Sequence, residues 1–114
     1  MQHGDKKEVF LQKLAATFPD KKSREAAMAI LRQYGVERHE RESERVWLAV
    51  LKISGNDLAQ ISRNTALAKQ DFRDILVAAE YPNQARVGPM PDSREKRKLI
   101  EKDRLQYEKW LSDD

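Results

Sequence analysis

The chain has 114 residues, of which 39% are hydrophobic, so it is long enough for one domain with one core. Its 22 lysine and arginine residues stand against 19 aspartate and glutamate residues, and the formal net charge of +3 is weak evidence for a nucleic-acid-binding protein. Cysteine is absent, which excludes disulfides, thiolate nucleophiles and cysteine-ligated metal sites.

The first helix is predicted over residues 5–18. Asp5 is placed to cap its start, and Glu8, three residues later, can accept free backbone N–H groups. Pro19 prevents the helix from continuing. The predicted inward face consists of Phe10, Leu11, Leu14 and Phe18.

A second helix is predicted in the segment that follows. It starts at Asp20 or Ser23, either of which can cap it, and it ends at Gly35, which can take the left-handed conformation. Val36 is expected to fold back on the helix. The predicted inward residues are Ala27, Ile30, Leu31 and Tyr34.

The third helix is predicted to be the centre of the domain. Residues 46–53 are almost continuously apolar, and a helix that is apolar around so much of its circumference is usually covered by its neighbours. We expect Trp47, Val50 and Leu51 to be mostly buried. Residues 54–56 then supply a stop, and Asn56 is expected to cap the next helix.

Two more helices are predicted between residues 57 and 81, and Pro82 ends the second of them. No window of the chain shows the strict alternation of a strand, so the fold class is predicted to be all-α. The inward residues are predicted to be Leu58, Ile61, Leu67 and Ala68 in the first helix, and Phe72, Ile75, Leu76 and Ala79 in the second.

Residues 57–80 have an alternative interpretation as a degenerate helix-turn-helix, in which the second helix reads DNA base edges. Ala59 suits the small position where the two helices cross. The turn departs from the motif, because Arg63 stands where glycine is expected and Asn64 where an apolar residue is expected. Phosphates would also repel the second helix, whose polar residues are Asp71, Arg73, Asp74 and Glu80. The pattern therefore favours two core helices.

The stretches "RVWLAVLKISGNDLAQI" and "AKQDFRDILVAAEYP", which cover about residues 45–82, resemble a family of short, uncharacterised, all-helical bacterial proteins. In that family an apolar "RV-LA-LK" helix precedes an "AK-D-RD-L--AEYP" segment. The resemblance implies an intact small helical domain and a bacterial origin. It implies no activity and assigns no site residue.

The composition changes after Tyr81. Residues 82–92 hold three of the four prolines and one glycine, which is typical of an extended linker. A last, amphipathic helix is predicted over residues 93–111, with Asp92 and Glu95 in capping-box spacing at its start. Its predicted i,i+4 ion pairs are Arg97–Glu101 and Arg104–Glu108.

The last helix carries both candidate binding sites. An isolated helix of this length is marginal in water, so we expect its apolar face to be covered by its own domain or by a second copy. Because Tyr and Trp concentrate binding energy at interfaces, the candidate partner-binding residues are Ile100, Tyr107, Trp110 and Leu111. The basic start of the helix, although interleaved with acids, supplies the candidate nucleic-acid-binding residues Arg94, Lys96, Arg97 and Lys98.

The charged run over residues 37–45 does not have the spacing of a metal site. His39 and Glu42 are one helical turn apart, but Ser43 stands where a helical zinc site needs a second histidine, and the other histidine of the chain is His3. We interpret the run as a solvated helix start. No catalytic triad or phosphate-binding glycine loop can be assigned, so no catalytic residue, metal or cofactor is predicted.

These patterns predict a bundle of about five short helices over residues 5–81, a linker over 82–92 and an amphipathic helix over 93–111. The N-terminus has no apolar run typical of a signal peptide, and no segment approaches the ~20 apolar residues of a membrane span. We expect a soluble, cytoplasmic, non-catalytic interaction or regulatory module without a membrane partner. Its partner is expected to be an unidentified protein or a second copy, and weak nucleic-acid binding is the alternative.

Overall fold

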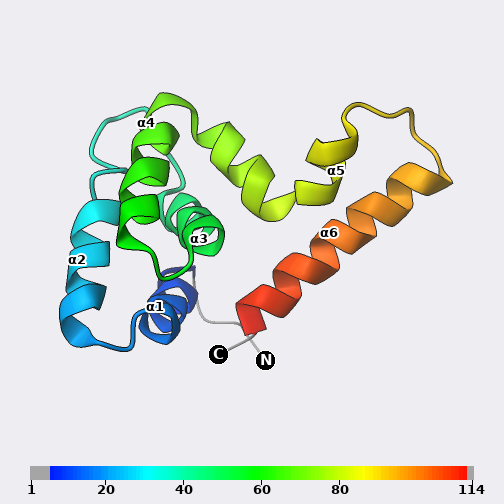
Figure 1. Ribbon diagram of the computed structural model, residues 1–114. Helices are drawn as coiled ribbons and strands as arrows, with labels where there is room; N and C mark the ends of the chain where they lie inside the picture. Colours follow the sequence, from blue (N-terminus) through cyan, green and yellow to red (C-terminus); the bar gives the residue numbers. More distant parts are fainter. Residues whose placement is uncertain (1–5, 113–114) are drawn as a thin grey trace.

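Six helices form over residues 6–112, the part of the chain that the structure, a computed structural model, describes (Figure 1). These residues contain no strand, which confirms the all-α prediction. Asp5, the predicted first cap, lies outside them. The helices are α1 (Lys6–Thr17), α2 (Lys21–Leu31), α3 (Ser43–Ser54), α4 (Leu58–Glu80), α5 (Pro82–Val87) and α6 (Arg94–Ser112).

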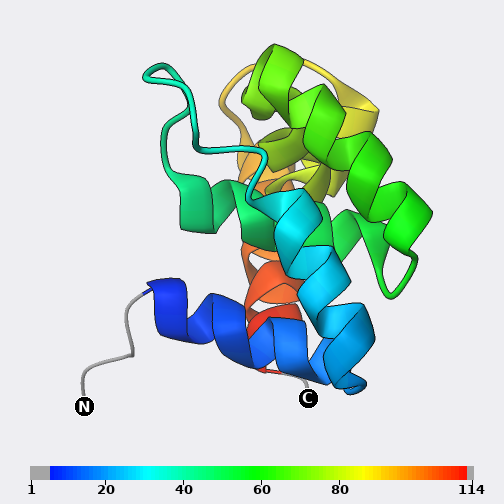
Figure 2. The same ribbon diagram turned by 90° about the vertical axis from the view of Figure 1, so that its left-hand side faces the viewer.

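The core is built around α3. Figure 2 shows α3 between α1 and α4, and α2 packs on α4. Val50 and Leu51 are each 1% exposed, and Trp47 is half-buried against Phe10, with 5.3 Å between the ring centroids. The prediction that the apolar third helix is the centre of the domain is therefore confirmed.

Helices α1 and α2 begin and pack largely as their sequences indicate. The Asp20 carboxylate caps α2 by accepting a hydrogen bond from the Ser23 backbone N–H at 2.9 Å. Two predictions are wrong, because Leu11 is 46% exposed and Val36 is 71% exposed. Leu11 lies about 100° around the helix from Phe10, so it falls beside the buried face. The buried apolar residues of this part are Phe10, Leu14, Phe18, Ala27, Leu31 and Tyr34.

Helix α4 is two helical segments joined at Asp71. This residue has the extended dihedral angles φ −157° and ψ 97°, and its carboxylate accepts a hydrogen bond from the Arg73 backbone N–H at 3.0 Å. Asp71 therefore caps the second segment, which agrees with the prediction of two consecutive core helices. The first segment is capped by Asp57, not by the predicted Asn56. Leu67, predicted to point inward, is 43% exposed, because the buried face of this segment is Ile61, Thr65 and Ala68.

Thr65 is a polar residue inside the core. It is 1% exposed, and its hydroxyl oxygen has no hydrogen-bond partner in the described structure. Replacing Thr65 by Val, which has the same shape without the hydroxyl, is expected to raise the free energy of unfolding by about 0.5–1.5 kcal/mol. Urea denaturation measures the change. The control is Thr17→Val, which is expected to be neutral or destabilising because the Thr17 hydroxyl donates to the Lys13 carbonyl at 2.8 Å.

The proline-containing linker precedes α6, but its first half is helical. Residues 82–92 were expected to be extended, whereas α5 occupies Pro82–Val87. A proline is compatible with the first turn of a helix, where its missing N–H has no intrahelical partner. The cap of α6 is Ser93, not Asp92, because the Ser93 hydroxyl accepts from the Lys96 backbone N–H at 3.2 Å. Figure 1 shows that α5 and the following loop reverse the chain, so that α6 runs back towards α1.

Candidate partner-binding surface

Helix α6 is attached to α5 by a buried carboxylate. Asp103 is 1% exposed, and its two oxygens accept four hydrogen bonds of 2.8–3.0 Å from the backbone and side-chain amides of Asn83 and Gln84. Burial opposes the ionisation of Asp103, but these hydrogen bonds outweigh it and hold the pKa of the carboxyl below its usual value. The first turn of α5 thereby finds acceptors for its free N–H groups. Asp103 was not singled out from the sequence.

A second attachment joins the end of α6 to α1. Trp110 packs against the hydrophobic core, and the Lys13 ammonium lies 4.5 Å from the centroid of its indole ring. The same ammonium donates a hydrogen bond to the Trp110 backbone carbonyl at 2.5 Å. A cation at this place also suits the negative end of the helix dipole. Trp110, one of the predicted partner-binding residues, is thus used to dock α6 on its own domain.

The other three predicted partner-binding residues lie together. Ile100, Tyr107 and Leu111 are on one face of α6, and they line an open concavity of about 500 Å³ with Tyr81 at the end of α4. Ile100 is 45% exposed and Tyr81 is 41% exposed, whereas Tyr107 and Leu111 are half-buried. We call this feature the α6 concavity. Its charged lining residues are Glu80, Arg104 and Glu108.

One lining residue of the α6 concavity, Glu80, is held by an ion pair between α3 and α4. The Arg45 guanidinium donates to both carboxylate oxygens of Glu80, at 2.9 and 2.6 Å. Burial, and then the negative charge of Glu80, raise the pKa of the Tyr107 hydroxyl above its usual value. The Tyr107 ring stacks on Trp110 with 5.7 Å between the centroids. Tyr107 is therefore held in place on two sides.

A second concavity lies on the other side of Tyr81. It has a volume of about 380 Å³ and is formed by the end of α4, by α5, by the loop after α5 and by the start of α6. We call it the linker concavity. Tyr81 belongs to the lining of both concavities and separates them. The linker concavity is lined by Val77, Tyr81, Gln84, Ala85, Gly88, Pro89, Met90, Lys96 and Leu99.

The predicted nucleic-acid-binding residues start α6. Arg94, Arg97 and Lys98 are exposed, and Lys96 is half-buried in the lining of the linker concavity. Within residues 6–112 none of the four forms an ion pair. The predicted pair Arg97–Glu101 is wrong, because Glu101 pairs with Arg104 instead. The predicted pair of Arg104 with Glu108 is present at 2.9 Å.

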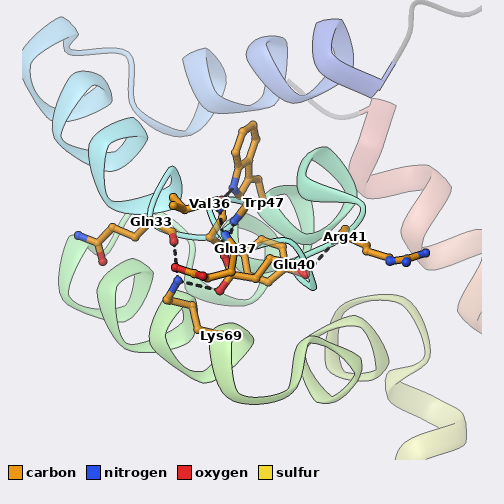
Figure 3. A network of polar contacts seen from close by, with 9 residues as sticks. Gln33, Val36, Glu37, Glu40, Arg41, Trp47 and Lys69 are labelled. Carbon is orange, nitrogen blue, oxygen red and sulfur yellow. Dashed lines mark hydrogen bonds and ion pairs between the residues drawn. The ribbon is translucent and has the colours of Figure 1, made fainter.

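The charged run over residues 37–45 is not simply a solvated helix start. Glu40 is 8% exposed, and one of its oxygens accepts the backbone N–H groups of Gly35, Val36 and Glu37 at 2.9–3.1 Å. Its other oxygen accepts from the Lys69 ammonium of α4 at 2.7 Å (Figure 3). Burial opposes ionisation, yet these partners lower the pKa of Glu40 to about 2. Glu40 therefore fastens the loop between α2 and α3 to α4.

Glycine is required where this loop begins. Gly35 has φ +107°, in the left-handed half of the map, and a Cβ there would lie 2.5 Å from the Ser43 hydroxyl oxygen. The predicted positive φ of Gly35 is thus confirmed, but the predicted helix end there is wrong, because α2 ends at Leu31 and turns connect it to Gly35. Two backbone carbonyls of the loop are also paired, because the Trp47 indole donates to the Tyr34 carbonyl and the Tyr34 hydroxyl donates to the Arg41 carbonyl.

Replacing Glu40 by glutamine is expected to lower the free energy of unfolding by about 1–3 kcal/mol at pH 7, because the Lys69 ammonium and the loop N–H groups lose a charged acceptor. A folded-state pKa near 2, against an ordinary 4.5, stabilises the fold above pH 4.5. This stabilisation is lost as the pH falls from 4.5 to 2, so the variant and the parent should converge there. Urea denaturation at several pH values measures the difference. Glu37→Gln, an exposed change in the same loop, is the control and should stay close to the parent.

His39 and Glu42 are both exposed, and the other histidine, His3, lies outside the described residues. Over residues 6–112 no three His, Asp or Glu side chains come together as a metal site would require. In the same range no helix has both the length and the apolar character needed to cross a bilayer.

No protein-family model, curated protein or solved structure matches the chain. The resemblance of residues 45–82 to a family of short helical bacterial proteins therefore stays a prediction. The features that bear on function are the two concavities around Tyr81 and the charges beside them.

Proposed function

We propose that the protein is a small, non-catalytic interaction module that binds another protein through the surface around Tyr81. The observation that carries this proposal is the distribution of large apolar side chains that stay exposed. Five of the eight in the described chain lie between residues 77 and 105, from the end of α4 through α5 to α6. They are Val77, Tyr81, Val87, Ile100 and Leu105.

Three of these side chains, Val77, Tyr81 and Ile100, line the two concavities, and exposed apolar side chains gathered at a concave surface are typical of a protein-binding site. Tyr81 suits this role because it offers a large ring with a polar edge, and Ile100 adds an aliphatic anchor in the same concavity. The ionic groups of the α6 concavity pair with one another or with neighbouring helices, as Arg45 does with Glu80. This supports binding without catalysis. The lack of cysteine in the chain fits a reducing compartment, and we propose the cytoplasm.

Site-specific photo-crosslinking tests the proposal. The crosslinking amino acid p-benzoylphenylalanine is placed at position 100 of the full chain, and this variant is expressed in the source cells of the protein. The control variant carries the same amino acid at position 12, because Gln12 is exposed on α1. We expect adducts from position 100 that are absent from position 12 and are lost when Tyr81 is changed to Ser. Adducts of two copies of the chain would identify the partner as a second copy. Equal crosslinking from both positions, or none from position 100, would contradict the proposal.

A further inference from the structure

The basic start of α6 is not explained by stability. Cations in the first turns of a helix are disfavoured by its dipole, by roughly 0.3–1 kcal/mol each. Arg94, Lys96, Arg97 and Lys98 occupy these turns, and none of them forms an ion pair with another described residue. Farther along the same helix, Arg104 has carboxylate partners on both sides. These cations are therefore free of carboxylate partners within the described chain and can accept an anion from outside it.

One of these cations, Lys96, lines an apolar depression, and Arg97 follows it in sequence. Lys96 lines the linker concavity together with Leu99, which lies one turn farther along the same face of α6. The lining also includes Val77 of α4, Tyr81 directly after α4, and Met90 of the loop. Apolar atoms and positive charge therefore meet at one site, which would fit a ligand that carries both an apolar group and a negative charge.

We infer that the linker concavity binds a partner's amphipathic peptide segment that carries carboxylates beside its apolar side chains. This inference rests on the proposed function and specifies the chemistry of the partner. The volume of about 380 Å³ suits one or two apolar side chains of such a segment. The partner's Asp or Glu residues lie beside Lys96 and Arg97, where opposite charges favour the correct partner and repel a basic one.

A protein segment fits this site better than a nucleic acid does. Single-stranded nucleic acids are held by rings on which successive bases stack. Among the nine residues that line the linker concavity, Tyr81 is the one aromatic residue, and the others include the aliphatic Val77 and Leu99. Glu95 lies among the cations and would repel phosphates. The lining thus favours apolar side chains over bases.

Fluorescence anisotropy with the full chain and three labelled peptides tests the inference. The first peptide is an amphipathic helix of about 14 residues with leucine at i, i+3, i+4 and i+7 spacing and glutamate elsewhere. The second has lysine in place of each glutamate, and the third has serine in place of each leucine. We expect the first to bind at least about tenfold more tightly than either of the others, since about 1.4 kcal/mol of favourable contact corresponds to that ratio.

Variants of the full chain assign the binding to the linker concavity. Lys96→Glu with Arg97→Glu should weaken binding of the acidic peptide at least about tenfold, because like charges then face each other. Lys102→Glu with Lys109→Glu, an equal charge change at exposed positions of α6, should leave it within about twofold. Met90→Ser should also weaken it, since Met90 contributes to the apolar wall. Circular dichroism confirms that each variant is folded.

Three outcomes would overturn the inference. One is equal affinity for the acidic and the lysine peptides, and another is an acidic peptide that binds equally to both charge variants. The third is a single-stranded oligonucleotide that binds more tightly than the acidic peptide and depends on Lys96 and Arg97, which would make the ligand a nucleic acid. If one of these outcomes occurs while position 100 still gives position-specific adducts, the inference fails and the proposed protein-interaction function stands. If position 100 also gives no adducts, the inference and the proposed function both fail.

Discussion

Replacing Asp103 by asparagine is expected to detach α6 and to lower the free energy of unfolding by about 3 kcal/mol or more. Asparagine keeps one acceptor oxygen but turns an NH₂ group towards N–H groups that donate to the carboxylate in the parent. Hydrogen bonds to a charged group are worth roughly 1.5–3 kcal/mol each, and two of the four lose their acceptor. The substitution thus removes the main polar link between α5 and α6.

The emission of Trp110 reports the detachment directly. Trp47 is first changed to Phe, so that Trp110 is the one remaining tryptophan of the chain. In this background we expect a blue-shifted emission that iodide quenches poorly, and in Asp103→Asn a red shift with efficient quenching. Denaturation in urea gives the change in stability. Glu95→Gln, an exposed acid-to-amide change on the same helix, is the control. Unchanged emission and stability in Asp103→Asn would show that this carboxylate does not hold α6.

Leu51→Ala is expected to lower the free energy of unfolding by about 2–5 kcal/mol. Leu51 is 1% exposed on the buried face of α3, and a large-to-small change there leaves a cavity that the packed neighbours close only in part. Leu67→Ala is the matched control, because Leu67 is 43% exposed and its truncation should cost less than about 1 kcal/mol. Similar losses for the two variants would contradict the central position of α3.

The helices and the core were largely predictable, because they depend on the spacing of apolar residues along the chain. The burial of Leu51 could be predicted because it lies in an apolar run that leaves the helix without a polar face. Leu11 and Leu67 show the limit of this rule, since each lies about 100° from a buried neighbour and the sequence does not fix the edge of the buried face. The helical turn after Pro82 was missed because its free N–H groups are satisfied by Asp103, about twenty residues away.

The two buried carboxylates could not be identified in advance. Asp103 and Glu40 each stand in a charged stretch, and their neighbours in sequence are exposed acids and bases of the same types. What distinguishes them are donors that only the folded chain brings close. These are Asn83 and Gln84 for Asp103, and Lys69 for Glu40, whose other donors are nearby loop N–H groups. Local spacing carries no information about such distant partners.

The candidate site was predicted in part. Ile100, Tyr107 and Leu111 are separated by seven and four residues, which places them on one face of a helix, and the structure brings them together. Trp110 is one position before Leu111 and points towards α1, so it docks α6 on its own domain. Tyr81 was treated as the end of a helix, and its place between two concavities depends on how α5 and α6 fold back beside it.

The contact between α1 and α6 has a consequence for synthesis of the chain on the ribosome. Lys13 and Trp110 are 97 positions apart, so the indole that covers Lys13 is translated only after the helices between them. At about 5–20 residues per second, α1 waits several seconds for this partner after it emerges. During that time the nascent bundle exposes the part of the core that Trp110 covers, where holdase chaperones and aggregation compete with completion of the fold. The last helix thus ends this period of exposure when it docks.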